Sequence, residues 1–311
     1  MSFNLIIEVM LPLAILVAAG GLWSAVSGIS VKALRTQLNN LALYVFVPAL
    51  MFSIAASTRI DTALLTVPLL VAGGILITGT LLYVLLYHSP LGRGLPNRTR
   101  AALLLSGMFG NVFYLGYPIL VFLHGTPAGK YPAFADMMAS TPLLWTVGVW
   151  IATSLGAQEK QAHESPWRVM RRLPPVWAFL LGTALNQSGL GWQPLIHAAA
   201  LIGQATIPLM MFVIGLSIPW KTLRPGRALL TVVGVKLCVM PALIWALVWL
   251  FFGPLAEESR AAVIVSAMPT MLMAVLIADR FHLDTAAAAL MIGWSTLLFW
   301  FTLPLWLALL V

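Results

Sequence analysis

The stretch SGMFGNVFYLGYP, residues 106–118, combines residue types that interrupt a helix with one that can bind a ligand. Its three glycines weaken a helix, and Pro118 removes a backbone N–H donor. Asn111 adds an amide that both donates and accepts hydrogen bonds. The surrounding run is apolar, and unpaired backbone groups are tolerated inside a membrane only when they are buried in protein or line a cavity. We therefore interpret the stretch as a broken membrane helix that presents Asn111, Gly110, Tyr114 and freed backbone groups to a ligand.

A second apolar run is interrupted by AMPTM, residues 267–271, which contains Pro269 and Thr270. Two broken helices that meet at mid-membrane depth place their half-helix ends at a substrate, and the positive N-terminal ends favour anions. The alternative is that each break is a proline kink, with Asn111 packed as a bridge between neighbouring helices.

The composition is that of an all-α membrane protein. Of 311 residues, 61% are hydrophobic and only 8% are charged, whereas soluble domains carry about 25% charged residues. The expected partner is therefore the lipid bilayer. The net charge of +8 does not indicate a nucleic-acid partner, because the charges lie in short loops. With a single cysteine, Cys238, no disulfide within the chain is expected.

Apolar runs long enough to cross a bilayer predict ten transmembrane spans. An interfacial helix is expected over 28–37. The spans are expected near residues 4–26, 38–57, 62–87, 99–123, 131–156, 174–190, 197–218, 227–252, 259–279 and 284–310.

Basic residues predict the orientation of these spans. The loops that follow odd-numbered spans carry thirteen Lys and Arg, and the other loops carry three. By the positive-inside rule the first set is cytoplasmic. We therefore expect an inner (plasma) membrane protein with both termini on the periplasmic or extracellular side.

An offset of 160 residues aligns the two halves of the chain. VPALMFSIAAS (47–57) lies over IPLMMFVIGLS (207–217), and TRAALLLSGM (99–108) lies over SRAAVIVSAM (259–268). Because each unit has five spans, the second must be inverted in the membrane, which is typical of secondary transporters. The pattern predicts one repeat over 1–156, a cytoplasmic linker over 157–173 and an inverted repeat over 174–311.

Several motifs make the chain resemble the auxin efflux carrier family, which includes plant auxin carriers and bacterial carriers of small organic anions. They are LNNLALYVFVPALMF, GNVFYLGYP, IPLMMFVIGLSI, KLCVMPAL and AMPTMLMAVLIADRF. The resemblance implies a scaffold of spans 1, 2, 6 and 7 and a mobile transport unit of spans 3–5 and 8–10. It also implies that spans 4 and 9 cross at Pro118 and Pro269.

The same resemblance bears on the substrate. In plant members, a polar residue on span 2 and a Gln on span 5 help to hold the carboxylate. The nearest positions in this chain are Met51 and Thr141. This difference favours a smaller acid than indole-acetate.

Lys236 lies about ten residues into span 8, about 15 Å deep at 1.5 Å per residue. An ionisable residue at that depth is a candidate functional group. Three roles remain open for it: pairing with the substrate, proton coupling, or bracing the broken helices through their carbonyls.

Other polar residues are weaker candidates. Ser140 and Thr141 could face the crossing, or they could bond the carbonyl four residues back in their own helix. Asp136 is expected near the outer end of span 5, in contact with water. No metal site, cofactor, nucleophile–base pair or phosphate-binding loop is indicated, and we do not expect an enzyme.

These observations predict a secondary transporter that moves small carboxylates across the inner membrane by an alternating-access, elevator-like mechanism. The alternatives are a sodium- or proton-coupled symporter or antiporter on a similar fold, and a membrane sensor that does not transport. The sequence leaves open whether the protein forms a homodimer.

Overall fold

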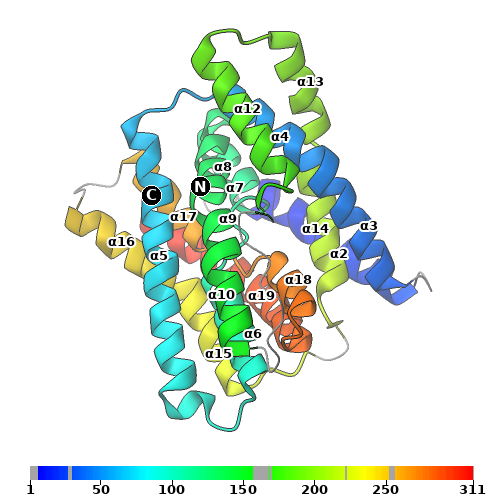
Figure 1. Ribbon diagram of the computed structural model, residues 1–311, viewed down its shortest axis with the longest axis vertical. Helices are drawn as coiled ribbons and strands as arrows, with labels where there is room; N and C mark the ends of the chain where they lie inside the picture. Colours follow the sequence, from blue (N-terminus) through cyan, green and yellow to red (C-terminus); the bar gives the residue numbers. More distant parts are fainter. Residues whose placement is uncertain are drawn as a thin grey trace.

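The computed structural model describes residues 6–26, 30–156, 168, 170–220, 223–251 and 256–310. Within these ranges every named element is a helix (Figure 1). Most of the predicted linker over 157–173 lies outside the described residues. The all-α fold class is confirmed for the described part of the chain.

Helices of very different lengths make up the first half of the chain, and several of them join end to end through π-helical turns. They are α2 (Leu11–Val26), α3 (Val31–Leu41), α4 (Val47–Ser57), α5 (Thr62–Tyr87), α6 (Asn97–Met108), α7 (Gly116–His124), α8 (Lys130–Ala135), α9 (Thr141–Leu143) and α10 (Val149–Ile151).

The second half begins at Pro174 in the described structure. Its helices are α12 (Pro174–Ser188), α13 (Gln193–Gly203), α14 (Thr206–Ser217), α15 (Arg227–Gly234), α16 (Met240–Phe251), α17 (Glu257–Ser266), α18 (Met273–Arg280) and α19 (Thr285–Leu310).

Seven helices in the described residues are long and apolar enough to cross a membrane. They cover Glu8–Val26, Val31–Ser57, Thr62–Tyr87, Thr126–Leu155, Gln193–Ser217, Arg227–Phe251 and Thr285–Leu310. Each overlaps one predicted span. Of the remaining three predicted spans, one is the shorter helix α12, and the other two are the broken pairs α6–α7 and α17–α18. Ten spans therefore remain a prediction.

The structure does not contain the separate interfacial helix that was expected before the second span. α3 continues through the π-helical turn Ala42–Phe46 directly into α4. The only proline near the junction, Pro48, is the second residue after the π-helical turn, and the helix continues through it. No helix breaker therefore separates the two elements.

The helices pack into two groups. In the first group, α4 lies against α12 and α13, and α2 lies against α14. Gly20 of α2 lies against the carbonyl of Phe212 on α14, and Gly215 of α14 lies against the carbonyl of Val17, with no room for a Cβ at either glycine. Small residues of this kind let helix backbones approach closely within a membrane.

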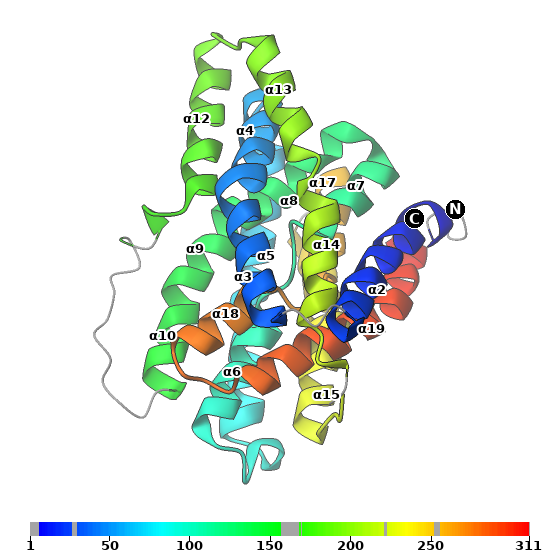
Figure 2. The ribbon, with the colours of Figure 1, turned by 90° about the vertical axis from the view of Figure 1, so that its right-hand side faces the viewer.

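The second group contains α5 to α10 and α15 to α19, and it holds both broken helices. α5 packs on α6, α16 and α17, and α19 packs on α6. Contacts between the two groups are sparse by comparison. In Figure 2, α12 and α13 of the first group reach the top of the molecule, whereas α6 and α15 of the second group lie toward the bottom.

Candidate functional site

The two broken helices meet at their gaps and join by backbone hydrogen bonds. The N–H of Asn111 donates to the carbonyl of Pro269 at 2.6 Å, and the N–H of Met271 donates to the carbonyl of Phe109 at 3.2 Å. Gly110 and Thr270 form an antiparallel bridge between them. Two short extended segments therefore satisfy each other's backbone groups, as burial in an apolar environment requires.

The hydroxyl of Thr270 holds the end of α6. Its Oγ1 donates to the carbonyl of Ser106 at 2.9 Å, and its N–H donates to the Oγ of Ser295 at 3.0 Å. Ser106 lies in the last turn of α6, where carbonyls have no partner within the helix. Thr270 thus occupies a structural position and does not line the neighbouring pocket.

Lys236 donates a corresponding hydrogen bond to a carbonyl in the last turn of α17. Its side chain is fully buried, and Nζ donates to the carbonyl of Ser266 at 3.4 Å and to Sδ of Met240 at 3.0 Å. A Cβ built on Gly110 would lie 2.7 Å from this Nζ. Of the three roles left open by the sequence, this geometry favours the brace.

The pairing of these residues follows the offset of 160. Ser106 and Ser266 are related by it, and so are Gly110 and Thr270. Thr270 therefore caps Ser106 with its own hydroxyl, whereas the missing side chain at Gly110 leaves space in which Lys236 caps Ser266. One hydroxyl and one ammonium do equivalent work on the two helices.

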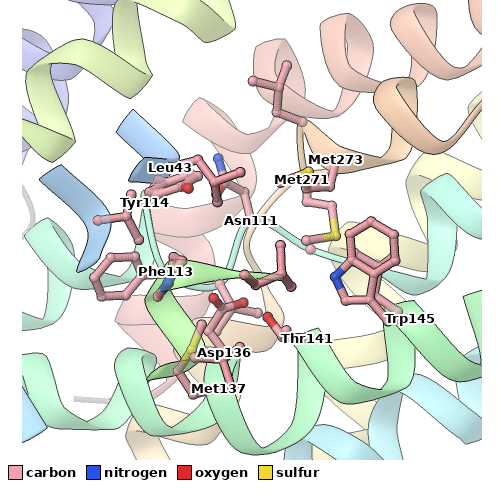
Figure 3. A pocket seen from close by; sticks show the side chains of 18 residues that line it. Leu43, Asn111, Phe113, Tyr114, Asp136, Met137, Thr141, Trp145, Met271 and Met273 are labelled. Atoms are coloured by element: carbon pink, nitrogen blue, oxygen red, sulfur yellow. The ribbon is translucent and has the colours of Figure 1, made fainter. Parts of the chain in front are cut away.

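A pocket of about 60 Å³ lies beside the first gap. Four of the predicted site residues line it, namely Gly110, Asn111, Tyr114 and Thr141. The others lie outside its lining, namely Met51, Pro118, Ser140, Lys236, Pro269 and Thr270. Figure 3 shows Asp136 and Thr141 on one wall, with Asn111, Met271 and Met273 beyond them.

Asn111 is the pocket residue with an unused donor. Its side chain is 4% exposed, and its Nδ2 has no hydrogen-bond partner among the described residues. Since this nitrogen donates to no neighbouring helix in the described structure, it does not act as the donor of a packing bridge. A buried amide without a partner is costly, which favours a ligand that accepts its hydrogen bond.

Pro118 lies away from the paired segments. It is the third residue of α7, and the hydrogen bonds between the gaps involve residues 109–111 and 269–271. A crossing of spans 4 and 9 stays a prediction, and the backbone pairing includes Pro269 but not Pro118. The reason is that a proline in the first helical turn needs no N–H partner, so it starts α7 instead of forming the gap.

Asp136 was underestimated by the sequence interpretation, which placed it at the watery end of its span. In the structure it lines the pocket together with Thr141. The connecting turn, Asp136–Ser140, is π-helical, and the N–H of Thr141 donates to the carbonyl of Asp136. A π-turn puts residues five apart on one face, whereas in an α-helix they would point in different directions.

The segments that lead into both half-helices line the pocket. Val112, Phe113 and Tyr114 precede α7, and Leu272 precedes Met273, the first residue of α18; all five line the pocket. The first N–H groups of a helix have no partner within it and carry a partial positive charge. The lining also includes the indole of Trp145, which the sequence analysis did not single out.

Comparison with known proteins identifies the family of the chain. Residues 5–307 match a family described as membrane transport protein. An uncharacterized transporter from Methanothermobacter thermautotrophicus is 29% identical over 280 residues, which is 87% of this chain and 87% of that protein. With several apolar helices, the chain is a multi-pass membrane protein. It belongs to this family of membrane transporters, the auxin efflux carrier family that its motifs indicated.

Proposed function

We propose that this protein is a secondary carrier of small organic anions, with a carboxylate as the substrate group. It works by alternating access, with spans 4 and 9 crossing at the substrate site within two inverted five-helix repeats. The observation that carries the proposal is the unpartnered Nδ2 of Asn111, buried in a pocket at the gap of a broken helix. Membership of a transporter family sets the general activity.

Anion recognition follows from the donors that converge on the pocket. Asn111 supplies a directed N–H, and the N-terminal end of α18, whose first residue Met273 lines the pocket, supplies a partial positive charge. Hydrogen bonds to a charged acceptor are about twice as strong as those between neutral groups. A carboxylate therefore gains more from this arrangement than a neutral ligand does.

The pocket size favours a small substrate. A cavity of about 10–15 Å³ holds one water molecule, so a pocket of about 60 Å³ accommodates a few heavy atoms. The side chains of Phe113, Tyr114 and Trp145 narrow it. An acid with a short chain fits these dimensions better than one that carries a bicyclic aromatic ring.

The two groups of helices supply the moving parts of an elevator-like mechanism. The first group corresponds to the scaffold predicted from spans 1, 2, 6 and 7, and the second corresponds to the transport unit. The pocket takes Leu43 and Val47 from the scaffold stretch and the gap residues from the transport unit. A substrate there lies between two bodies that share few contacts, so either body can slide past the other.

The pocket also suggests which side is open. It contains Leu173 and Pro175 at the start of α12, the end that the positive-inside rule assigns to the cytoplasm. In Figure 2 this end of α12 lies near mid-height, well above α10. The transport unit is then displaced toward the cytoplasm relative to the scaffold, which describes an inward-facing state.

The experiment that tests this function is counterflow in proteoliposomes. Vesicles loaded with an unlabelled short carboxylate should accumulate the labelled form when they contain the wild-type protein, because a carrier exchanges substrate across the membrane. A membrane sensor would bind the same acid without flux. Binding without counterflow over a panel of short mono- and dicarboxylates would contradict the proposed function.

A separate test concerns the topology. Reporter fusions at the C-terminus should read as periplasmic, and fusions within 157–173 should read as cytoplasmic. The same side for both would remove the odd number of spans in each half, and the inverted repeat with it.

A further inference from the structure

Asp136 poses a problem for an anion site. Its carboxylate points into the pocket that holds Asn111 and Thr141 (Figure 3). Among the described residues, no Lys, Arg or His lies within ion-pair distance of it. An ionised carboxylate here repels the carboxylate that the helix end attracts, and the low dielectric strengthens that repulsion.

We propose that Asp136 carries a proton with each substrate, so that the pocket accepts an organic anion only when this carboxyl group is neutral. The inference rests on the proposed function and specifies its coupling ion. The proton binds a carboxylate oxygen of Asp136, the substrate enters ionised, and both leave on the other side. For a monocarboxylate, one proton and one negative charge cross together, so transport is electroneutral.

The surroundings of Asp136 support a proton over a metal cation. The other lining residues with polar side chains are Asn111, Tyr114, Thr141 and Trp145. The second gap, the stretch around Leu43 and the start of α12 contribute apolar side chains to the lining. A bare cation needs a shell of oxygen ligands, whereas a proton needs only the carboxylate itself.

Among the titratable and charged groups near the pocket, Asp136 is the one whose charge can change. Tyr114 is the other titratable side chain in the lining, and a phenol stays neutral at physiological pH. Lys236 does not line the pocket, because its ammonium lies against Gly110 and bonds the carbonyl of Ser266. Neutralising Asp136 by protonation therefore removes the negative charge from the pocket wall.

The first experiment measures substrate affinity against pH for purified wild-type protein and for Asp136→Asn. The asparagine keeps the shape and removes the charge. In the wild type, the dissociation constant for a short monocarboxylate should rise about tenfold per pH unit wherever the free Asp136 is ionised, since one proton is linked to binding. In Asp136→Asn it should stay flat at the wild type's low-pH value. An equally steep profile in both proteins overturns the inference.

The second experiment measures flux in proteoliposomes. A pH gradient should drive accumulation of a monocarboxylate by the wild type, and a membrane potential alone should not. Asp136→Asn should still exchange substrate but should respond to the potential instead, because its transport carries net charge. Asp61→Asn is the matched control: Asp61 caps α5, with its carboxylate accepting from the N–H of Leu64, and asparagine caps equally well.

Each remaining outcome decides the question. Accumulation that requires Na⁺ and ignores the pH gradient overturns the inference in favour of a sodium-coupled site. Loss of all binding in both Asp136→Asn and Asp136→Glu, with unchanged melting temperatures, overturns it in favour of a carboxylate that contacts substrate directly. Absence of counterflow in the wild type contradicts the proposed function, whereas normal, still pH-driven accumulation in Asp136→Asn contradicts only this inference.

Discussion

The two gaps are related in sequence but differ in what they leave unbonded. The gap over 267–272 is closed: Thr270 uses its N–H and its hydroxyl, and Pro269 has no N–H to satisfy. The gap over 109–115 is open: Gly110 has no side chain, and the amide nitrogen of Asn111 has no partner in the described structure. Both gaps line the pocket, but the second uses its polar groups to fasten the two broken helices, whereas the first brings an unbonded amide nitrogen to the pocket.

This difference shows how two similar halves can divide the work. Equivalent carbonyls, those of Ser106 and Ser266, need a donor in both halves, but the donors differ. Because Lys236 reaches in from α15–α16, Gly110 is free of any capping role, and the next residue can be an unpaired asparagine. The hydrogen bond from Lys236 to Ser266 therefore permits Asn111, next to Gly110, to serve as a binding group.

The largest expected effect comes from making the open gap resemble the closed one. Gly110→Thr adds a Cβ within 2.7 Å of Nζ of Lys236 and 3.0 Å of the carbonyl of Met268. Such overpacking costs about 1–3 kcal/mol, so we expect a lower melting temperature and little transport.

Adding Lys236→Leu to Gly110→Thr gives a double variant, which tests whether the new threonine clashes with the ammonium of Lys236. Leucine is chosen because Leu76 stands at the position related to Lys236 by the offset of 160. In the double variant the new hydroxyl can cap Ser266 as Thr270 caps Ser106, so part of the melting temperature should return. If the double variant melts lower than Gly110→Thr alone, the two donors are not equivalent, and the comparison between the gaps is wrong. Thermal denaturation in detergent gives the melting temperatures of the wild type, Gly110→Thr and the double variant.

Thr270→Val should have an intermediate effect. It removes the hydroxyl that bonds the Ser106 carbonyl while keeping the side-chain shape. Hydrogen bonds between membrane helices contribute about 0.6–2 kcal/mol, so the melting temperature should fall and substrate affinity should change little. A variant that melts normally but has lost substrate affinity would place Thr270 at the site and not in the brace.

The smallest effect is expected from Pro118→Ala. Pro118 lies in the first turn of α7, outside the paired segments, and a compatible proline acts mainly on the unfolded chain by about 0.4–1 kcal/mol. Transport should stay close to that of the wild type. A strong loss of transport with a normal melting temperature would show that the gap depends on this proline.

Sequence reasoning predicted the elements well because composition and helix breakers control them. The run of apolar residues bounded by Asp61 and His88 predicts the helix Thr62–Tyr87, and its observed ends agree. The glycines of the first interruption and Pro269 of the second likewise predict gaps, and the structure has gaps there. Asn111 and Thr141, both named as candidates from the sequence, line the same pocket, and their role in binding stays a prediction.

Other features depend on geometry that one sequence does not display. The position of Asp136 depends on a π-helical turn, which has no clear sequence signal. The brace by Lys236 depends on which face of its helix meets α17, and the sequence gives only its depth. Met51 is fully buried on α4 and does not line the pocket, so its position in the sequence alone did not establish a contact with substrate.

The most direct test of the central claim compares the substrate affinity of Asn111→Ala with that of Thr270→Val. A lost hydrogen bond to a charged group is worth about 1.5–3 kcal/mol, and about 1.4 kcal/mol corresponds to a factor of ten. Asn111→Ala should therefore bind a short carboxylate about 10- to 150-fold more weakly than the wild type. It should melt normally, because Nδ2 has no partner among the described residues. Normal affinity together with a much lower melting temperature would show that Asn111 is a packing residue and that the substrate binds elsewhere.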